Sequence, residues 1–499
     1  MHRTMEWLAV DAAAVPRRDV TGWLTATVRA AIADGTLVVG AALPATRTLA
    51  ERLCVSRGVV VEAYRRLADE GVVTGHRGGG TRVAGTRLGA AAPAAPAGPP
   101  IVPRPAPEID LRPGLPDLSA FPRTAWLRAE RTVLAELPAA ALGYGDPRGT
   151  PQLRTALAAW LTRSRGVRAT PHDVLVVNGV AQGLSLLAQV LRERGERRLA
   201  FEDPGSPGTR DQMARRGLEI VPVPVDAEGL DVAALARTGV PTVLATPAHQ
   251  FPTGVVLGAA RRRELVAWAR GGGLVVEDDY DAEHRYDRRP VAAVQALAPD
   301  RVVHVGSVSK TLSPALRLGW VIAPAHLHDA LVEAKQWSDI ATPALGQLVL
   351  AHLLDSGGFD RHLRLVRARQ RARRDALLAA LAEHLPRAGV QGIAAGLHLT
   401  VTLPGPLDDA AVADRALAAG VDVQALSRCR LGTGPPGLVI GYAAATPDRI
   451  REGIRRLALT ITATGSPAHR AAPSPRSPGP APPASPGASP ARSTRGSPA

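Results

Sequence analysis

SVSKTLSPALRLG, at residues 307–319, contains one of only two lysines in a chain of 499 residues. The other 58 basic side chains are arginine. A lysine amine can form an imine, whereas a guanidinium stays protonated and is a poor nucleophile. Lys310 is therefore a candidate for covalent chemistry through its amine. The simpler alternative is a surface lysine in a loop, which is what we expect for the second lysine, Lys335.

The residues that flank Lys310 favour one cofactor. Ser307, Ser309 and Arg317 bring two hydroxyls and a guanidinium that can hold a phosphate group near the amine. Pyridoxal 5′-phosphate (PLP) combines an aldehyde with a phosphate, and proteins that use it hold it as a Schiff base on a lysine. The stretch therefore predicts a Schiff-base lysine at position 310.

Length and composition predict a soluble protein of several folded units, because 499 residues exceed one compact core. The net charge of +15 permits a polyanionic partner without proving one, since the arginine excess is spread thinly. Cys54 and Cys429 are too few for a disulfide framework and stand in no metal-ligand spacing, so we expect no metal site. No apolar stretch approaches a membrane span, which predicts a cytoplasmic protein without a membrane partner.

Composition divides the chain into four segments. Residues 15–85 form a first folded unit, and the proline- and alanine-rich residues 86–108 are typical of an extended linker. Residues 109–462 form a second, larger unit. Residues 463–499 contain mostly Ser, Pro, Ala, Gly and Arg, which predicts a disordered tail.

The larger unit alternates short apolar runs with helical patterns, which predicts strands of a mostly parallel sheet that are buried on both faces. The runs are residues 174–177, 199–201, 220–223, 243–245, 274–276 and 302–305. Polar clusters follow five of them, at 178–179, 202–205, 246–250, 277–280 and 307–310. Because ligands of such sheets bind at the carboxyl ends of the strands, we expect these clusters to meet. Beyond about residue 358, long helices and a strand at 397–401 predict a smaller α+β subdomain.

Residues 19–84 carry three helical patterns and a glycine-rich hairpin. Residues 46–53 and 56–67 predict two short helices across a tight turn, with Ser56 as the N-cap of the second. Residues 71–83 predict a two-stranded wing. This order is typical of a winged helix-turn-helix, which is mainly α. A small helical docking module with a solvated basic face is the alternative.

This unit resembles the GntR family of bacterial regulators. LPATRTLA at 43–50, VSR at 55–57 and the glycine-rich run before Thr81 match its three sequence blocks in order. The resemblance implies DNA binding through Arg47 and Arg57, with His76 and Arg77 at the tip of the wing. Cys54 replaces the glycine that the family usually has in the turn.

The larger unit resembles the fold-type I aminotransferases over residues 109–460, and the whole folded chain resembles the MocR subfamily of GntR regulators. The motifs that carry this resemblance are YGDPRG at 144–149, TPAHQFPTG at 246–254, EDDYD at 277–281 and the lysine stretch. The implied fold is an α/β domain of the PLP-dependent aminotransferase type with a small α+β C-terminal subdomain.

The resemblance also implies roles at the cofactor. Lys310 would form the internal aldimine, Asp278 would pair with the pyridine nitrogen, and Tyr280 would contact the phenolic oxygen. Gln250 would stand where aminotransferases usually have an asparagine. The phosphate would bind the backbone N–H groups of Val180 and Ala181 together with Ser307, Ser309 and Arg317. For Asp278 the alternative is a carboxylate that caps a turn, and for Arg317 a surface ion pair.

Two departures from the family bear on activity. Ser206 stands where the family usually places an aromatic residue against the cofactor ring. The late stretch at 438–442 lacks the arginine that binds a substrate carboxylate in aminotransferases, and Arg428 and Arg430 lie before a long glycine- and proline-rich loop. We therefore expect no efficient transamination of an ordinary amino acid.

Three hypotheses of function remain. The favoured one is a transcription regulator that senses PLP, or an amine bound to it as an aldimine, and that binds an operator of two half-sites as a head-to-tail homodimer. The alternative is a working PLP-dependent aminotransferase with a fused DNA-binding domain. A third is a domain that no longer holds the cofactor and serves only dimerisation.

Overall fold

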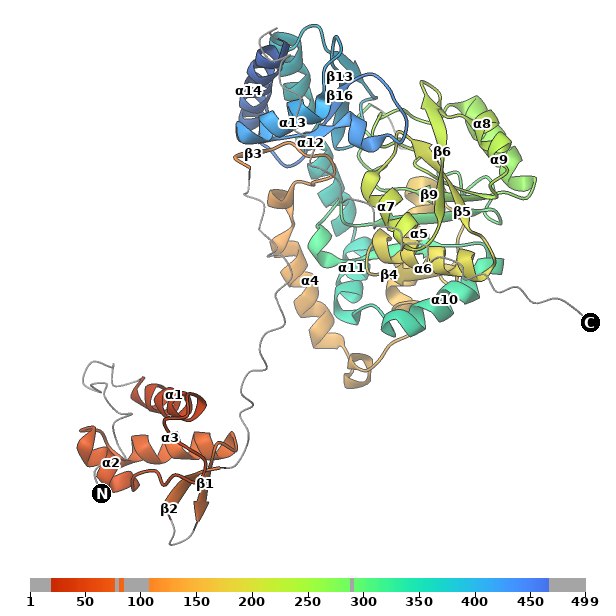
Figure 1. The fold of residues 1–499 in the computed structure, drawn as a ribbon. Helices are drawn as coiled ribbons and strands as arrows, with labels where there is room; N and C mark the ends of the chain where they lie inside the picture. Colours follow the sequence, from red (N-terminus) through yellow and green to blue (C-terminus); the bar gives the residue numbers. More distant parts are fainter. Residues whose placement is uncertain (1–18, 77–79, 85–106, 288–290, 466–499) are drawn as a thin grey trace, which may run out of the picture. The chain divides into compact units, whose positions relative to one another are not determined.

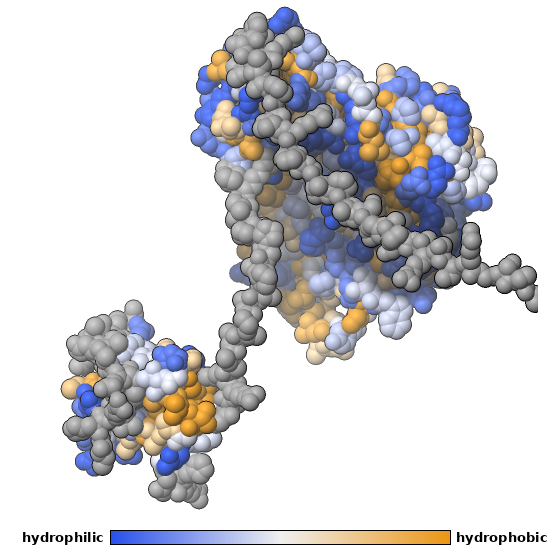
Figure 2. All heavy atoms as spheres, in the orientation of Figure 1, coloured by the Kyte–Doolittle hydropathy of each residue, from blue (hydrophilic) through white to orange (hydrophobic). Residues whose placement is uncertain are grey.

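The computed structural model describes residues 19–76, 80–84, 107–287 and 291–465. They belong to two compact units, within residues 1–105 and 106–499. Figure 1 traces both units, and the face seen in Figure 2 mixes hydrophilic and apolar residues on each. The proposed linker lies almost wholly outside the described residues, as does most of the proposed tail, although the last helix continues to Gly465.

The first unit is a winged helix-turn-helix, as predicted. Its elements are α1 (Val20–Ala33), α2 (Thr46–Arg52), α3 (Arg57–Asp69), β1 (Val73–His76) and β2 (Gly80–Val83). The two strands pair antiparallel. Val60, Tyr64 and Leu67 recur at helical spacing on one face of α3 and are buried in the core of this unit. The Tyr64 hydroxyl donates to the carbonyl of Pro44 at 3.0 Å, which fixes the chain that enters α2.

The turn between α2 and α3 has Cys54 in a backbone conformation that glycine usually adopts. Cys54 is exposed and has a φ of 52°, in the left-handed region that glycine normally occupies. Ser56 takes the N-cap position of α3, but its side chain makes no capping hydrogen bond. The predicted position of the cap is therefore right, while the predicted contact is missing.

The second unit contains a mixed eight-stranded sheet in the order β4-β11-β10-β9-β8-β5-β6-β7. The strands are β4 (Val174–Val177), β5 (Arg198–Asp203), β6 (Glu219–Asp226), β7 (Gly229–Leu230), β8 (Thr242–Ala245), β9 (Leu274–Asp278), β10 (Val302–Ser307) and β11 (Gly319–Ile322). Neighbours from β10 through β9, β8 and β5 to β6 run parallel, whereas β11 is antiparallel to both β10 and β4. Sequence analysis missed β11, because it directly follows the lysine stretch.

Both faces of this sheet are covered. Val174 and Val176 of β4 belong to one apolar cluster, and the alternating Leu175 and Val177 belong to another. The helices of this part are α4 (Arg123–Glu136), α5 (Pro151–Arg165), α6 (Val180–Glu193), α7 (Pro207–Arg215), α8 (Val232–Thr238), α9 (Ala259–Arg270), α10 (Ala325–Asp339) and α11 (Ala344–Asp355). The prediction of burial on both faces was wrong for β6, whose residues are mostly exposed or half-buried, because only the two-residue β7 lies beyond it.

The 27-residue helix α12 (Gly358–His384) leads into the smaller α+β subdomain that the sequence predicted (Figure 1). This small lobe has a four-stranded antiparallel sheet in the order β12-β13-β16-β15. Its elements are β3 (Ile109–Asp110), β12 (Gly389–Gln391), β13 (His398–Thr402), α13 (Asp409–Ala418), β14 (Val421–Asp422), β15 (Gln424–Ala425), β16 (Gly437–Gly441) and α14 (Pro447–Gly465). The first strand of the unit, β3, pairs parallel with β14, which closes the chain on itself.

The prediction that Lys335 is a surface lysine was wrong. It lies on α10 with no exposed surface and forms an ion pair with Asp339, at 2.5 Å between Nζ and Oδ1. Burial lowers its pKa, and the Asp339 carboxylate opposes that shift. Asp339 also accepts hydrogen bonds from Asn178 and Gln182. The Lys335 ammonium therefore pairs with the carboxylate that joins α10 to the start of α6.

Loss of Lys335 should leave this carboxylate without its cation. We expect Lys335→Ala to lower the free energy of unfolding by about 1–3 kcal/mol, less than for a fully buried pair because Asp339 keeps two amide donors. Urea denaturation of the full chain measures the change. Glu333→Ala, an exposed change on the same helix, is the matched control and should stay within about 0.5 kcal/mol of the parent. Equal stabilities of the two variants would contradict the role assigned to the pair.

Candidate functional site

Three of the predicted polar clusters, at 246–250, 277–280 and 307–310, line one cavity of about 590 Å³ at the carboxyl ends of the parallel strands. The clusters at 178–179 and 202–205 do not line it themselves, but the residues that follow them, Val180 and Ser206, do. It is lined by residues that follow β4, β5, β8, β9 and β10. Those among them that the sequence singled out are Val180, Ala181, Ser206, Asp278, Tyr280, Ser307, Ser309, Lys310 and Arg317. Residues to which the sequence analysis gave no role at the cofactor also line it, among them Gly114, Gln212, Thr246, Phe251 and Gln424.

Lys310 points its amine into this cavity. The Nζ atom donates to the carbonyl oxygen of Gly114 at 2.6 Å. Burial lowers the pKa of Lys310, and the carboxylates of Asp281 and Asp278 oppose the shift. A lowered pKa increases the fraction of neutral amine, which is the nucleophilic form.

Asp278 ends β9 next to this lysine. Its Oδ1 atom is buried and has no hydrogen-bond partner among the described residues. Burial raises the pKa of Asp278 to about 7, and the neighbouring charge of Asp279 adds to the rise. Such a carboxylate favours a ligand that brings a positively charged N–H group.

The start of α6 supplies a cradle for an anion. Gly179 precedes the helix with a φ of 79°, and a Cβ there would lie 3.0–3.1 Å from the Arg317 guanidinium. Arg317 donates to the carbonyl of Asn178 at 2.6 Å. The cation and the free N–H groups of the first helical turn thus lie on one side of the cavity, and Ser307 and Ser309 line it as well.

Tyr280 and Gln250 differ in their positions. Tyr280 lines the cavity, and its hydroxyl lies 3.0 Å from Nδ1 of His249. Gln250 is fully buried and does not line the cavity. Its amide donates to Glu202 and to the carbonyls of Pro204 and Phe251, and its oxygen accepts from Thr253. The next residue, Phe251, lines the cavity in its place.

The two departures seen in the sequence have structural counterparts. Ser206 lines the cavity and caps α7, where its hydroxyl accepts from the backbone of Thr209 at 3.3 Å. Neither Arg428 nor Arg430 lines the cavity. Arg428 pairs with Asp414 at 2.9 Å, and Arg430 donates to the carbonyl of Pro435. Among the described residues, the basic side chains that line the cavity are Lys310 and Arg317.

The basic side chains of the first unit surround its helix-turn-helix. Arg57 is the first residue of α3, is exposed, and makes one weak contact with Thr46, at 3.4 Å. Arg47 on α2 is exposed and lies 3.2 Å from Glu51. Arg65 is instead held by Glu62 and Asp69. His76 ends β1, but its side chain lies outside the described structure, and so does all of Arg77.

Comparison with known proteins assigns both units. Residues 24–83 match the bacterial regulatory proteins of the gntR family, and residues 109–457 match aminotransferase class I and II. The probable rhizopine catabolism regulatory protein MocR of Rhizobium meliloti is 32% identical over 90% of this chain and 96% of its own length. The pyridoxine biosynthesis transcriptional regulator PdxR of Corynebacterium glutamicum is 34% identical over 86% of this chain and 93% of its own.

Solved structures agree for the second unit. An archaeal alanine:glyoxylate aminotransferase has a TM-score of 0.67 at 26% identity, over 71% of this chain and 91% of its own. The α-aminoadipate aminotransferase LysN of Thermus thermophilus, complexed with N-(5′-phosphopyridoxyl)-L-leucine, has a TM-score of 0.65 at 29% identity, over 72% and 93%.

Within the described residues, no helix combines the length and the apolar character that crossing a membrane requires. Both units and the full-length relatives lead to one assignment. The chain belongs to the GntR family of DNA-binding transcription regulators, in the MocR type that carries an aminotransferase-like domain.

Proposed function

We propose that this regulator binds PLP on Lys310 and changes its affinity for DNA in response to PLP or to an amine bound to it. The observation that carries the proposal is the position of the Lys310 amine, the unpartnered Oδ1 of Asp278 and the Arg317 guanidinium around one cavity. An amine, a buried carboxylate and an anion cradle are complementary to the aldehyde, the ring nitrogen and the phosphate of PLP. When bound, PLP supplies an electrophilic carbon that captures amines.

Each residue then has a defined task. Lys310 binds the aldehyde carbon, and Asp278 keeps a proton on the ring nitrogen. Tyr280 donates to the phenolic oxygen from the cavity wall. The phosphate is held by the backbone N–H groups of Val180 and Ala181 and by Ser307, Ser309 and Arg317. Gln250 takes no direct part in this arrangement, because its amide is already committed to Glu202 and two carbonyls.

Transamination finds no comparable support. An α-carboxylate needs a cation of its own, and Arg317 is committed to the phosphate in this arrangement. Arg428 and Arg430 are engaged elsewhere, as their contacts with Asp414 and Pro435 indicate. Sensing therefore fits the cavity better than turnover of amino acids.

A homodimer would link ligand binding to DNA. The second unit exposes Leu127, Leu134, Leu142, Tyr144, Trp337 and Ile340, which a partner subunit could cover. We propose a head-to-tail arrangement of two chains that presents two winged helices to an operator with two half-sites. Arg47, Ser56 and Arg57 would contact the DNA at the helix-turn-helix, with His76 and Arg77 at the wing. Acting on chromosomal DNA would place the protein in the cytoplasm.

Covalent labelling tests the cofactor site directly. We expect borohydride reduction in the presence of PLP, followed by peptide mapping, to find a pyridoxyl group on Lys310. Lys310→Ala should lose the label, the visible absorbance and the effect of PLP on operator binding. Glu333→Ala, an exposed change on α10, is the control and should keep all three, because Glu333 does not line the cavity. A parent protein without label at position 310 would overturn the proposal.

The buried carboxylate predicts a pH dependence. The pKa of Asp278 is about 7 in the folded chain against an ordinary 3.8, so the folded state keeps its proton over a range where the unfolded state has lost it. The free energy of unfolding of the ligand-free chain should therefore fall as pH rises from about 4 to about 7, by about 1–3 kcal/mol.

Asp278→Asn should reduce this fall and stabilise the ligand-free chain at pH 8, while it weakens PLP binding about tenfold or more. A fall should persist from Glu202 and Glu283, because burial raises the pKa of each to about 7 as well. Denaturation at several pH values and PLP titration by absorbance measure both effects. Asp300→Asn, at an exposed site, should change neither. An unchanged affinity for PLP would rule out the pairing with the ring nitrogen.

DNA binding depends on a different set of side chains. We expect Arg57→Ala to weaken binding to an operator from the protein's own promoter region about tenfold or more, and to reduce the salt dependence of binding. Fluorescence anisotropy at several salt concentrations gives both quantities. Arg65→Ala is the matched control, because Glu62 and Asp69 already neutralise that guanidinium. Similar losses for the two variants would show that α3 does not bind through its first turn.

A further inference from the structure

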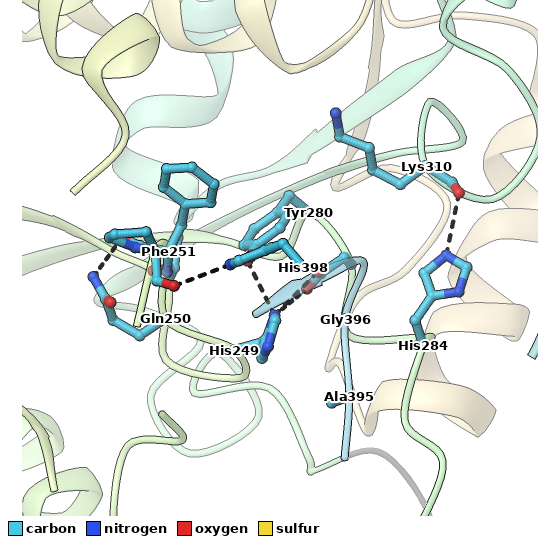
Figure 3. Close-up of polar contacts among 12 residues, drawn as sticks. His249, Gln250, Phe251, Tyr280, His284, Lys310, Ala395, Gly396 and His398 are labelled. Carbon is cyan, nitrogen blue, oxygen red and sulfur yellow. Dashed lines mark hydrogen bonds and ion pairs between the residues drawn. The ribbon is translucent and has the colours of Figure 1, made fainter. Parts of the chain in front are cut away.

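Three buried side chains gather behind Tyr280, outside the residues that line the cavity. They are His249, which follows β8, Asp281, which follows β9, and His398 on β13 of the small lobe. Their exposed fractions are 3%, 1% and 1%. One ligand atom from each lies within 4.8 Å of the other two. Figure 3 shows the rings of His249 and His398 close to Tyr280.

The hydrogen bonds of His398 fix its tautomer. Nε2 lies 3.2 Å from the carbonyl oxygen of Pro252, which can only accept, so Nε2 carries the proton. Nδ1 is then unprotonated and carries a lone pair. This atom is buried and has no hydrogen-bond partner among the described residues. A histidine whose outer N–H is held by a backbone carbonyl is oriented in the way that metal ligands usually are.

His249 faces the carboxylate of the same cluster. Its Nδ1 lies 3.0 Å from one oxygen of Asp281 and 3.1 Å from the other, and it donates to them when protonated. Nε2 of His249 is buried and has no partner in the part of the chain that the structure describes. The cluster therefore combines one carboxylate with two imidazoles, and each imidazole has an unused ring nitrogen.

We propose that His249, Asp281 and His398 bind a divalent transition-metal ion, of the Zn²⁺ or Co²⁺ type. Two imidazoles and one carboxylate are a donor set that suits these ions and disfavours Mg²⁺ and Ca²⁺, which take oxygen ligands. Binding uses Nδ1 of His398 and an oxygen of Asp281. It also uses Nδ1 of His249, whose proton moves to the unpartnered Nε2 of the same ring, so that no proton is lost.

Metal binding requires the three side chains to move closer together. Donors at about 2.1 Å from a shared ion lie about 3.4 Å apart at the tetrahedral angle, so present separations of up to 4.8 Å must contract by about 1 Å. The Tyr280 hydroxyl lies 3.0 Å from Nδ1 of His249, the atom proposed as a ligand.

The ion would connect the two lobes of the second unit. His249 and Asp281 belong to loops of the large sheet, whereas His398 belongs to the small lobe. Metal binding would therefore stabilise their contact and add to the hydrogen bonds that Pro252 accepts from His398 and Thr400. No metal-binding sequence motif predicts these ligands, because they are far apart in the sequence, at positions 249, 281 and 398.

Titration of the full chain without a purification tag tests the site. The protein is stripped with a chelator and titrated with Co²⁺, followed by visible absorbance, elemental analysis and thermal unfolding. We expect one equivalent of Co²⁺ per chain, an absorption band typical of low coordination number, displacement by Zn²⁺ and a raised Tm. His398→Gln, which can still donate to Pro252, and Asp281→Asn should each weaken binding about 10–100-fold.

The control is His326→Gln, which removes an exposed histidine on α10 and should leave affinity and stoichiometry unchanged. Circular dichroism checks that each variant is folded, and the Co²⁺ spectrum of the parent protein decides the question if one is not. Binding far below one equivalent, or equal binding by the parent and both ligand variants, would show that the cluster is only a hydrogen-bonded core contact.

Discussion

A half-buried carboxylate whose Oδ1 has no hydrogen-bond partner among the described residues is the constraint around which the cavity is organised. Asp278 ends a strand whose other residues are core residues, and its Oδ1 meets no donor among the described residues. Such an arrangement costs stability unless a positively charged group arrives. The burial that raises the pKa of Asp278 therefore favours a ligand with a positive charge. A protonated ring nitrogen would donate to the carboxylate and offset the free-energy cost of burying it. The Lys310 amine donates to Gly114 and makes no hydrogen bond to Oδ1 of Asp278.

The parallel sheet explains why these groups converge. Strands β8, β9 and β10 are neighbours and run in the same direction, so the residues that follow them reach the same edge. The antiparallel β11 then returns from the lysine stretch and places Arg317 beside the start of α6. Glycine suits position 179, because its φ of 79° is unfavourable for other residues and a Cβ there would lie only 3.0–3.1 Å from the Arg317 guanidinium. Lys335 adds to this order by pairing with Asp339, which accepts hydrogen bonds from Asn178 and Gln182.

The sequence predicts the fold, and most of the residues that it assigns to the cofactor line the cavity, with Gln250 as the exception. Apolar runs followed by polar clusters predict the strands and the carboxyl-terminal edge of the sheet where the cavity lies. The rarity of lysine in the chain singles out Lys310 as the reactive amine. The sequence did not predict features that depend on tertiary contacts. Lys335 was expected on the surface, yet its charge is matched by Asp339 one helical turn away. Gln250 was expected at the cofactor, but its amide donates to the carbonyls of Pro204 and Phe251. Phe251 lines the cavity instead. The exposure of β6 depends on its place near the edge of the sheet, which no run of apolar residues reveals.

Sensing requires that ligand binds two conformations of the protein unequally. The contacts between the large sheet and the small lobe define what a second conformation must break. Asp203 accepts from the backbone of Leu431 and Gly432, and Gly205 donates to the carbonyl of Cys429. Elsewhere in the interface, Pro252 accepts from His398 and Thr400. Both sets begin in loops that also contribute to the cavity, through Ser206 and Phe251. A ligand that displaces either residue would act directly on the hydrogen bonds that hold the lobes together, so the cavity and the lobe interface share the same two loops.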